Sequence, residues 1–181
     1  WCDNSDTRHI YVKLINLIEL HNFYVPAGGD EPDPKINDKF KHKLDFLDEA
    51  TTYMKTKEKN AYTALVGDLN IAPHENDVWS HKQLLKIVSH TPVEVEKLNK
   101  FQDSIKFIDA LREFHPLSEK LYSWWSYRSK NWEESDRGRR LDHIWITQKL
   151  NKIIIKASIE KDVRRWDRPS DHSPLIADFK F

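Results

Sequence analysis

Residues 61–70, AYTALVGDLN, place a short apolar run directly before a carboxylate and a carboxamide. A run of this length, followed by glycine and polar residues, predicts a buried strand. Asp68 and Asn70 lie two residues apart, so their side chains share one face if the chain stays extended. A carboxylate there can activate a water or hold a hard cation, and an amide can donate to a developing oxyanion. An Asp-x-Asn turn that only caps the strand fits the spacing equally well.

The sequence on either side alternates between strand and helix patterns. Residues 8–25 are rich in β-branched and aromatic residues and predict two strands joined near Ile15 and Asn16. Residues 37–57 carry apolar side chains at helical spacing, which predicts an amphipathic helix lying on a sheet. Pro92 predicts the start of a second long helix. The other predicted elements are a weak helix at 80–88, a short helix at the end of 107–114, and strands at 121–127, 141–147, 152–161 and 174–181.

Because these elements mix without a linker or a repeat, the sequence predicts a single α/β domain over residues 1–181. The 29 basic residues balance the 29 acidic ones, which argues against a basic protein that coats a polyanion and leaves a local basic patch open. The 39% share of apolar residues excludes a disordered tail. No apolar run approaches the roughly 18–20 residues that cross a bilayer, so we expect no membrane partner.

The start of the chain is unusual. Residue 1 is Trp1 and the single methionine is Met54, so either processing or an absent N-terminal portion of the domain explains the beginning. Cys2 is the single cysteine, which excludes an intrachain disulfide and a cysteine zinc site. Together with the lack of a recognisable signal peptide, it leads us to expect a cytoplasmic protein.

Two further segments bring polar groups to strand ends. Residues 169–174, PSDHSP, set Asp171 beside His172; the histidine can contact a phosphate or transfer a proton, and the aspartate can bind a divalent metal. A plain surface turn is the alternative. Residues 22–26, NFYVP, carry Tyr24, whose phenol can hydrogen-bond a phosphate or serve in packing.

A third segment, residues 122–143, interleaves aromatic and cationic side chains. Aromatic rings offer stacking faces for unpaired bases, and cations neutralise backbone phosphates, so the run predicts nucleic-acid contact. The alternative is a tryptophan-rich edge of the core beside a solvated loop. The aromatic and cationic members are Trp124, Trp125, Tyr127, Trp132, Arg128, Lys130, Arg137, Arg139 and Arg140.

A loop upstream holds His74, Glu75 and Asp77, which resemble a metal cluster. Their open, polar surroundings favour solvated side chains instead.

Taken in order, the segments NFYVP, GDLNIAP, SWWSYRSKN with GRRLDHIW, and PSDHSP resemble the motifs of the exodeoxyribonuclease III and apurinic/apyrimidinic (AP) endonuclease family. The resemblance runs from about Arg8 to the C-terminus. It implies a four-layer α/β sandwich, in which two packed β-sheets are flanked by helices, with the N-terminal portion truncated. It also implies a metal-dependent DNA phosphodiesterase of base-excision repair, with 3′→5′ exonuclease and abasic-site endonuclease activity.

The resemblance also implies roles for individual residues. Tyr24 matches a tyrosine that approaches the scissile phosphate. Asp68 matches the aspartate that deprotonates the attacking water, and Asn70 its partner in stabilising the transition state.

In the C-terminal half, Asp142 matches the aspartate that orients the catalytic histidine, and His172 matches that histidine. Asp171 matches a carboxylate near the metal. The implied ligands of Mg²⁺ or Mn²⁺ are Asp68, Asn70, Asp171 and His172. The implied contacts to double-stranded DNA with abasic sites or 3′ ends are Trp124, Tyr127, Arg128, Lys130, Asn131 and Arg139.

Some positions depart from the family pattern. No residue before Ile10 supplies the family's first asparagine or its metal-binding glutamate, and Glu19 lies within the predicted hairpin. Ala27 replaces a polar residue, and Arg139 stands where some relatives carry an aromatic residue of the abasic pocket. We therefore expect residues 1–181 alone to be nearly inactive, to associate, and to need a complementing N-terminal fragment. Two other functions stay open: a superfamily phosphoesterase acting on lipid or inositol phosphates, and a non-catalytic DNA-binding remnant.

Overall fold

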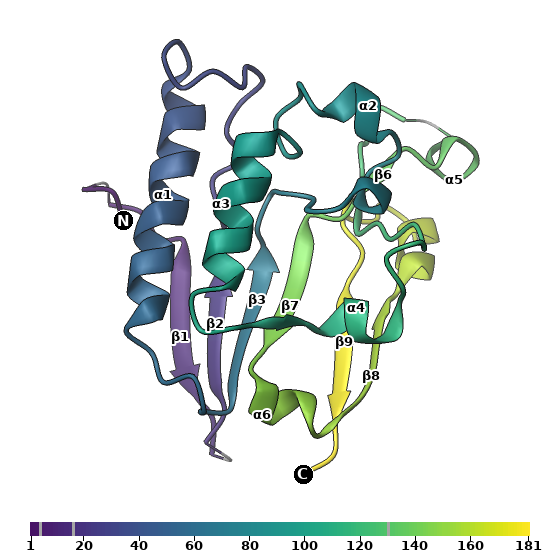
Figure 1. Ribbon diagram of the computed structural model, residues 1–181. Coiled ribbons are helices and arrows are strands. Elements are labelled where there is room, and N and C mark those ends of the chain that lie inside the picture. Colours follow the sequence, from purple (N-terminus) through teal and green to yellow (C-terminus); the bar gives the residue numbers. More distant parts are fainter. Residues whose placement is uncertain (4, 16, 130) are drawn as a thin grey trace.

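A five-stranded sheet forms the centre of the molecule, with strand order β1-β2-β3-β7-β4 (Figure 1). The computed structural model describes residues 1–3, 5–15, 17–129 and 131–181. β2 and β3 are parallel, and the other neighbouring pairs are antiparallel. The hairpin predicted within residues 8–25 is confirmed, although Asn16 lies outside the described residues. The strands are β1 (His9–Lys13), β2 (Glu19–Phe23), β3 (Thr63–Asp68), β4 (Ile108–Asp109) and β7 (Asp142–Ile146).

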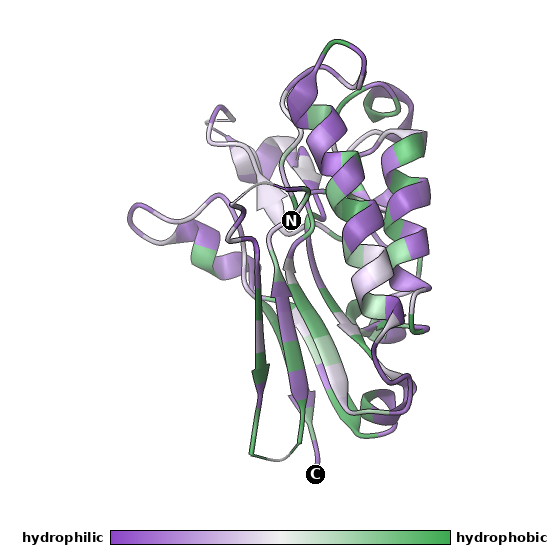
Figure 2. Ribbon diagram, turned by 90° about the vertical axis from the view of Figure 1, so that its left-hand side faces the viewer, coloured by the Kyte–Doolittle hydropathy of each residue, from purple (hydrophilic) through white to green (hydrophobic). Residues whose placement is uncertain are grey.

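Two long helices, α1 (Asp38–Lys55) and α3 (Pro92–Gln102), cover one face of this sheet (Figures 1 and 2). The side chain of Asn37 caps α1 by accepting hydrogen bonds from two backbone N–H groups. Thr91 and Glu94 form a capping box at the start of α3, directly before and after Pro92. The helix predicted at 37–57 is confirmed within about two residues at each end, and the second helix begins at Pro92 as predicted. Their apolar sides pack on β2, β3 and β7 through a buried cluster that includes Phe23, Phe46, Leu65, Phe101 and Trp145.

A second, two-stranded sheet packs on the opposite face. It consists of β8 (Ile154–Ile159) and β9 (Leu175–Phe179), which are antiparallel. Ala64 and Ile146 from the large sheet share a buried cluster with Ala157 from β8, and Ala177 from β9 packs against it. The predicted α/β class with two packed sheets is therefore confirmed.

The connections differ in part from prediction. The strand predicted at 121–127 is reduced to β5 (Trp124–Trp125), which pairs with β6 (Gly138–Arg139) inside the segment predicted to be a loop. The reason is that Leu121 donates its backbone N–H to Asn76 of a loop rather than to a neighbouring strand. Within the weak helix predicted at 80–88, the structure has only the short helix α2 (His81–Leu84). The remaining short elements are η1 (Glu75–Asp77), α4 (Ala110–Phe114), α5 (Trp132–Ser135), α6 (Gln148–Asn151) and η2 (Lys161–Arg165).

The face of β1 that lies away from α1 remains partly uncovered. Ile10 and Val12 alternate with His9, whose ring stacks on Phe23 on the helical side. They therefore point to the other face, where their side chains are 61% and 40% exposed. An exposed apolar sheet face beside an edge strand favours contact with another chain.

We expect purified residues 1–181 to self-associate through this face, because association would bury Ile10 and Val12. Sedimentation velocity measures the result. Ile10→Glu should shift the population toward monomer, whereas Ile36→Glu, at an equally exposed isoleucine in the loop before α1, should not. A monodisperse wild-type monomer contradicts this prediction.

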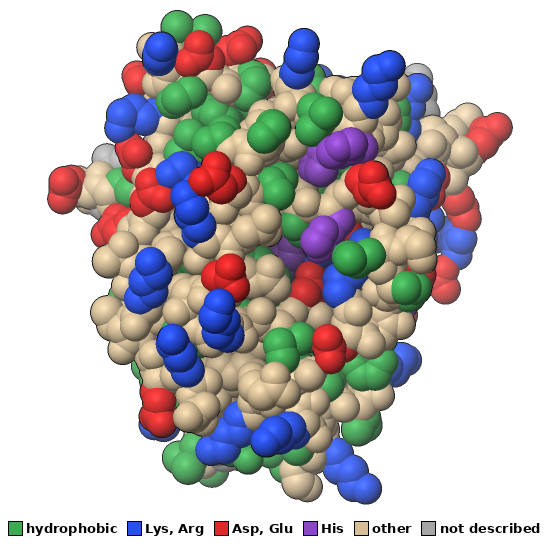
Figure 3. Space-filling view, in the orientation of Figure 1, with side chains coloured by type: hydrophobic (Ala, Val, Ile, Leu, Met, Phe, Trp, Pro, Cys, Tyr) green, Lys and Arg blue, Asp and Glu red, His purple; other side chains and the backbone are tan. Residues whose placement is uncertain are grey.

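The helical face carries no broad patch of one charge. Basic and acidic side chains alternate over α1 and α3 (Figure 3), in line with the zero net charge. None of the described helices is long and apolar enough to cross a membrane.

Candidate active site

Asp68 stands at the end of β3 because Gly67 allows β3 and β2 to approach closely. Gly67 adopts φ +127°, and a Cβ atom there would lie 2.0 Å from the carbonyl oxygen of Phe23. No other residue fits this position without moving the strands. On its other side, β3 pairs with β7 in a register that sets Asp68 directly opposite Asp142. Two carboxylates from distant parts of the chain thus meet at one end of the sheet.

Asn70 folds back onto Asp68 in a tight turn. The backbone N–H of Asn70 donates to Asp68 Oδ1 over 2.9 Å, and its side-chain Nδ2 donates to Asp68 Oδ2 over 3.1 Å and to the Val25 carbonyl over 2.9 Å. Asn70 has φ +54°, which asparagine tolerates better than most residues. Of the two arrangements that the spacing allowed, the structure has the turn and not the shared strand face: β3 ends at Asp68, and a turn joins the two side chains.

This arrangement decides which atom of Asn70 is available to a ligand. Both amide hydrogens are engaged by the two acceptors just named, so they are not available to an oxyanion. Among the described residues, nothing donates to Asn70 Oδ1. The free atom is an oxygen, which suits a hard cation better than an anion.

His172 is held by Asp142. Its Nδ1 lies 2.8 Å from Asp142 Oδ2, and its backbone forms an isolated β-bridge with Trp124. Burial alone would lower the pKa of His172, but the hydrogen bond and the charge of Asp142 outweigh it and raise that pKa. The segment 169–174 is therefore part of the site rather than a plain surface turn.

The surroundings of Asp68 raise the pKa of its carboxyl group. Burial first, and then the charge of Asp142, raise its pKa to about 6, although His172 and the Asn70 N–H counteract this in part. A carboxylate with a pKa near the working pH is suited to general-base chemistry. The closeness of two acidic side chains also means that a bound cation would relieve their repulsion.

A hollow of about 920 Å³ opens above these groups. Tyr24 lines it from the end of β2, where its ring lies 5.0 Å from the Arg8 guanidinium carbon. Asp171 does not line it; its Oδ2 instead accepts a hydrogen bond from Trp124 Nε1 over 2.9 Å. The predicted site residues that line the hollow are Tyr24, Asp68, Asn70, Trp124, Arg128, Arg139 and His172.

Two of the predicted DNA contacts lie outside the hollow. Tyr127 is exposed and donates its hydroxyl to the Pro169 carbonyl, and Asn131 donates to Glu134. Lys130 lies outside the described residues.

The aromatic run divides between the core and the site. Trp125 is buried and packs edge-on against the partly buried Trp132, so the Trp125 ring is not free to stack on a base. Trp124, on the opposite face of β5, lines the hollow. The composition of the run did not separate these two neighbouring tryptophans, whereas the family resemblance implied a DNA contact for Trp124 alone.

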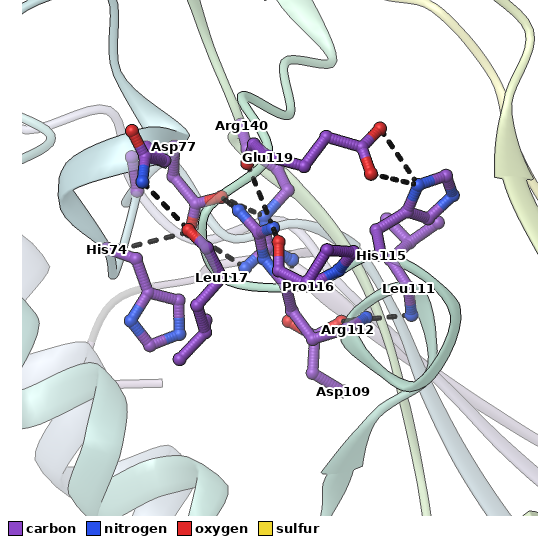
Figure 4. A network of polar contacts seen from close by, with 12 residues as sticks. His74, Asp77, Asp109, Leu111, Arg112, His115, Pro116, Leu117, Glu119 and Arg140 are labelled. Carbon is purple, nitrogen blue, oxygen red and sulfur yellow. Dashed lines mark hydrogen bonds and ion pairs between the residues drawn. The ribbon is translucent and has the colours of Figure 1, made fainter.

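Arg140 is not a DNA contact. It is fully buried and donates to both oxygens of Asp77 over 2.8 and 2.9 Å, and to Asp109 Oδ2 over 2.6 Å (Figure 4). Arg112 pairs with the same Asp77. Although burial opposes it, the charge of Arg140 keeps the pKa of Asp77 below its usual value. Asp77 is thus a buried structural anion, and the expectation of a solvated His74–Asp77 loop was wrong for it.

Trp79 and Arg137 also line the hollow, although neither is on the list of contacts that the resemblance implied. Arg137 belongs to the aromatic and cationic run over residues 122–143, so the composition of that run already indicated a contact at this position. Trp79 follows the polar loop after Asn70 and carries no motif of its own.

No group of three or more His, Cys, Asp or Glu side chains in the described part of the chain is arranged to hold a metal ion. The side-chain oxygens best placed to bind a metal ion are those of Asp68 and Asn70. Asp171 is less available, because its carboxylate accepts a hydrogen bond from Trp124.

Comparisons with known proteins agree with these observations. The model of the Endonuclease/Exonuclease/phosphatase family matches residues 23–172. Exodeoxyribonuclease III of Haemophilus influenzae is 31% identical over 190 residues, covering 98% of this chain and 69% of that protein. The structure of an AP endonuclease from Archaeoglobus fulgidus superposes with a TM-score of 0.89 at 31% identity, covering 96% of this chain and 65% of that one. The 3′-5′ exonuclease NExo from Neisseria meningitidis gives a TM-score of 0.89 at 25% identity, covering 99% and 67%. The chain spans about two thirds of the length of these relatives.

Proposed function

Because this chain belongs to the Endonuclease/Exonuclease/phosphatase family, in the branch of exodeoxyribonuclease III and the AP endonucleases, we propose that the intact protein cleaves DNA phosphodiesters. The proposed activities are a 3′→5′ exonuclease and an abasic-site endonuclease of base-excision repair, in the cytoplasm. The observation that carries the proposal is that Asp68, Asn70 and His172 line one hollow together with arginines, while Asp142 lies opposite Asp68 and holds His172.

Asp68 is the proposed base. Its raised pKa of about 6 leaves it ionised at neutral pH and still able to take a proton from water. The hydrogen bonds from Asn70 fix the carboxylate, so that its orientation does not depend on the substrate.

His172 is the proposed phosphate contact. With Nδ1 directed at Asp142, Nε2 is the nitrogen left for the substrate, and it donates only when the ring is protonated. The raised pKa of His172 increases the protonated fraction at neutral pH, which favours binding of a phosphate oxygen.

A divalent cation, Mg²⁺ or Mn²⁺, is the proposed cofactor. Mg²⁺ is commonly bound through one or two carboxylates plus substrate phosphates, and it keeps several waters. Asp68 and Asn70 Oδ1 fit that requirement, with Asp171 and His172 as the further candidates. When bound, the cation would neutralise the phosphate and the leaving oxygen.

A test separates this proposal from a phosphoesterase of lipid or inositol phosphates. Changing Trp124 and Arg128 to alanine should lower DNA turnover by the intact protein at least about tenfold, because a stacking face and a phosphate contact are lost together. Hydrolysis of a small phosphodiester should stay near the wild-type rate. Lys59→Ala, at an exposed lysine between α1 and β3, is the matched control and should change neither rate. An equal loss on both substrates contradicts the DNA assignment, and the absence of any metal-stimulated cleavage favours a non-catalytic DNA-binding protein.

A complementing N-terminal segment also remains a proposal. The exposed Ile10 and Val12 support it, since a further strand or sheet would bury them.

A further inference from the structure

Three arginines in the hollow have no acidic partner. Arg128, Arg137 and Arg139 all line it, and among the described residues none of them forms an ion pair with a carboxylate. By contrast, Arg112 pairs with Asp77, and Arg140 pairs with both Asp77 and Asp109. A guanidinium group that has no carboxylate partner can bind a phosphate through charge-assisted hydrogen bonds, so these arginines are suited to phosphate recognition.

Arg137 is held in place by an aromatic ring. Val78 forms a β-bridge with Arg139, and the backbone N–H of Trp79 donates to Gly138 over 3.1 Å, which sets Trp79 beside β6. The Arg137 guanidinium carbon lies 4.7 Å from the centre of the Trp79 ring. The ring itself is fixed, because Trp79 packs against the small core of Ala72, Val78 and Leu84.

Arg139 is placed differently. Its Nη1 donates to the Val88 carbonyl over 3.1 Å and to Ser89 Oγ over 2.7 Å, and its guanidinium lies over Trp124. The Nη1 hydrogens of Arg139 are therefore already used in hydrogen bonds within the protein. Arg137 makes no hydrogen bond to any described residue and is exposed, so its donors are free for a ligand.

A guanidinium positioned by cation–π contact loses less side-chain freedom when it binds an anion than one on a flexible side chain. We propose that Trp79 and Arg137 form a second phosphate subsite, which binds a backbone phosphate of the DNA strand other than the scissile one. This inference rests on the proposed function. Arg137 makes the contact, and Trp79 acts through Arg137 as a positioning residue.

Binding of the intact protein to a duplex oligonucleotide tests the subsite without catalysis, if a chelator is present. Fluorescence anisotropy over a series of salt concentrations gives both the affinity and its salt dependence. Loss of one phosphate contact should lower the slope of log K against log [salt] by about 0.9 in Arg137→Gln, and weaken binding roughly three- to tenfold at 0.1 M salt. Lys152→Gln, at an exposed lysine directly after α6, should leave the slope unchanged, because α6 lies at the opposite end of the molecule from β6 (Figure 1).

A double-mutant cycle tests the role of Trp79. Trp79→Ala should weaken binding in the wild-type background and have no further effect in Arg137→Gln, because its contribution passes through the arginine. Trp79→Phe keeps an aromatic face and should restore most of the affinity. An additional loss in the double variant would overturn the positioning role and indicate that a base stacks on the ring.

The outcomes separate the two proposals. If wild-type protein binds DNA with a normal salt slope and Arg137→Gln behaves like wild type, the subsite is wrong and the proposed function stands. If wild-type protein shows no salt-dependent binding to DNA, both fall.

Discussion

Asp68→Asn lowers DNA cleavage by the intact protein by about 10²–10⁴-fold, the usual effect of losing a general base. The change keeps the shape of the side chain and its hydrogen bond from the Asn70 N–H, but an amide does not accept a proton from water. Steady-state cleavage of an abasic duplex at saturating metal measures the effect, which should appear mainly in kcat.

Asp178→Asn is the matched control, because Asp178 is an exposed aspartate on β9 far from the hollow. Its activity should equal that of wild type. If Asp68→Asn retains activity within about threefold of wild type, Asp68 is not the general base.

Arg140→Met destabilises the fold by about 3–5 kcal/mol, because it leaves Asp109 without an ion-pair partner among the described residues and leaves Asp77 with Arg112 alone. Methionine is long and apolar enough to fill most of the space, so the loss comes from charge rather than from a cavity. Urea unfolding followed by tryptophan fluorescence gives the free energy of unfolding.

A second substitution shows whether charge is the cause. Asp109→Asn in the Arg140→Met background should recover part of the lost stability, since it removes the carboxylate that has lost its partner. Arg165→Met, which breaks an exposed ion pair with Glu133, should leave the unfolding curve nearly unchanged. If the two arginine variants unfold at the same urea concentration, the buried network does not stabilise the fold as described.

Local pattern was enough to predict much of the fold. The helix over residues 37–57 and the strand before Gly67 carry their signals within a single element, as apolar spacing or a bounded apolar run. Asp68 and Asn70 were found for the same reason, since the sequence places them two residues apart. The spacing did not decide between a shared strand face and a turn, because the end of a strand depends on its neighbours, here on the approach of Phe23 to Gly67.

Contacts between distant segments were harder to predict. Asp142 and His172 are separated by 30 residues, and neither segment by itself predicts that the two side chains are in contact. Their pairing was predicted from the family resemblance. Arg140 and Asp77 lie 63 residues apart, each in a polar stretch that reads as solvated. Whether such charged groups are buried depends on how distant segments pack together, and this packing cannot be deduced from residue type and spacing alone.

The backbone hydrogen bonds at the start of β7 have a consequence for motion. Arg140 donates its N–H to Asp77, Leu141 and Asp142 donate theirs to Ser123 Oγ, and Leu69 donates to Leu141. Amide protons bonded in this way exchange with solvent deuterium only when a large part of the domain opens. Arg137, at the rim of the hollow, is exposed, and its backbone N–H donates to none of the described residues, so this amide should exchange far sooner. Adjustment to differently shaped DNA ends would then occur at the rim, while the carboxylates and the histidine keep one geometry.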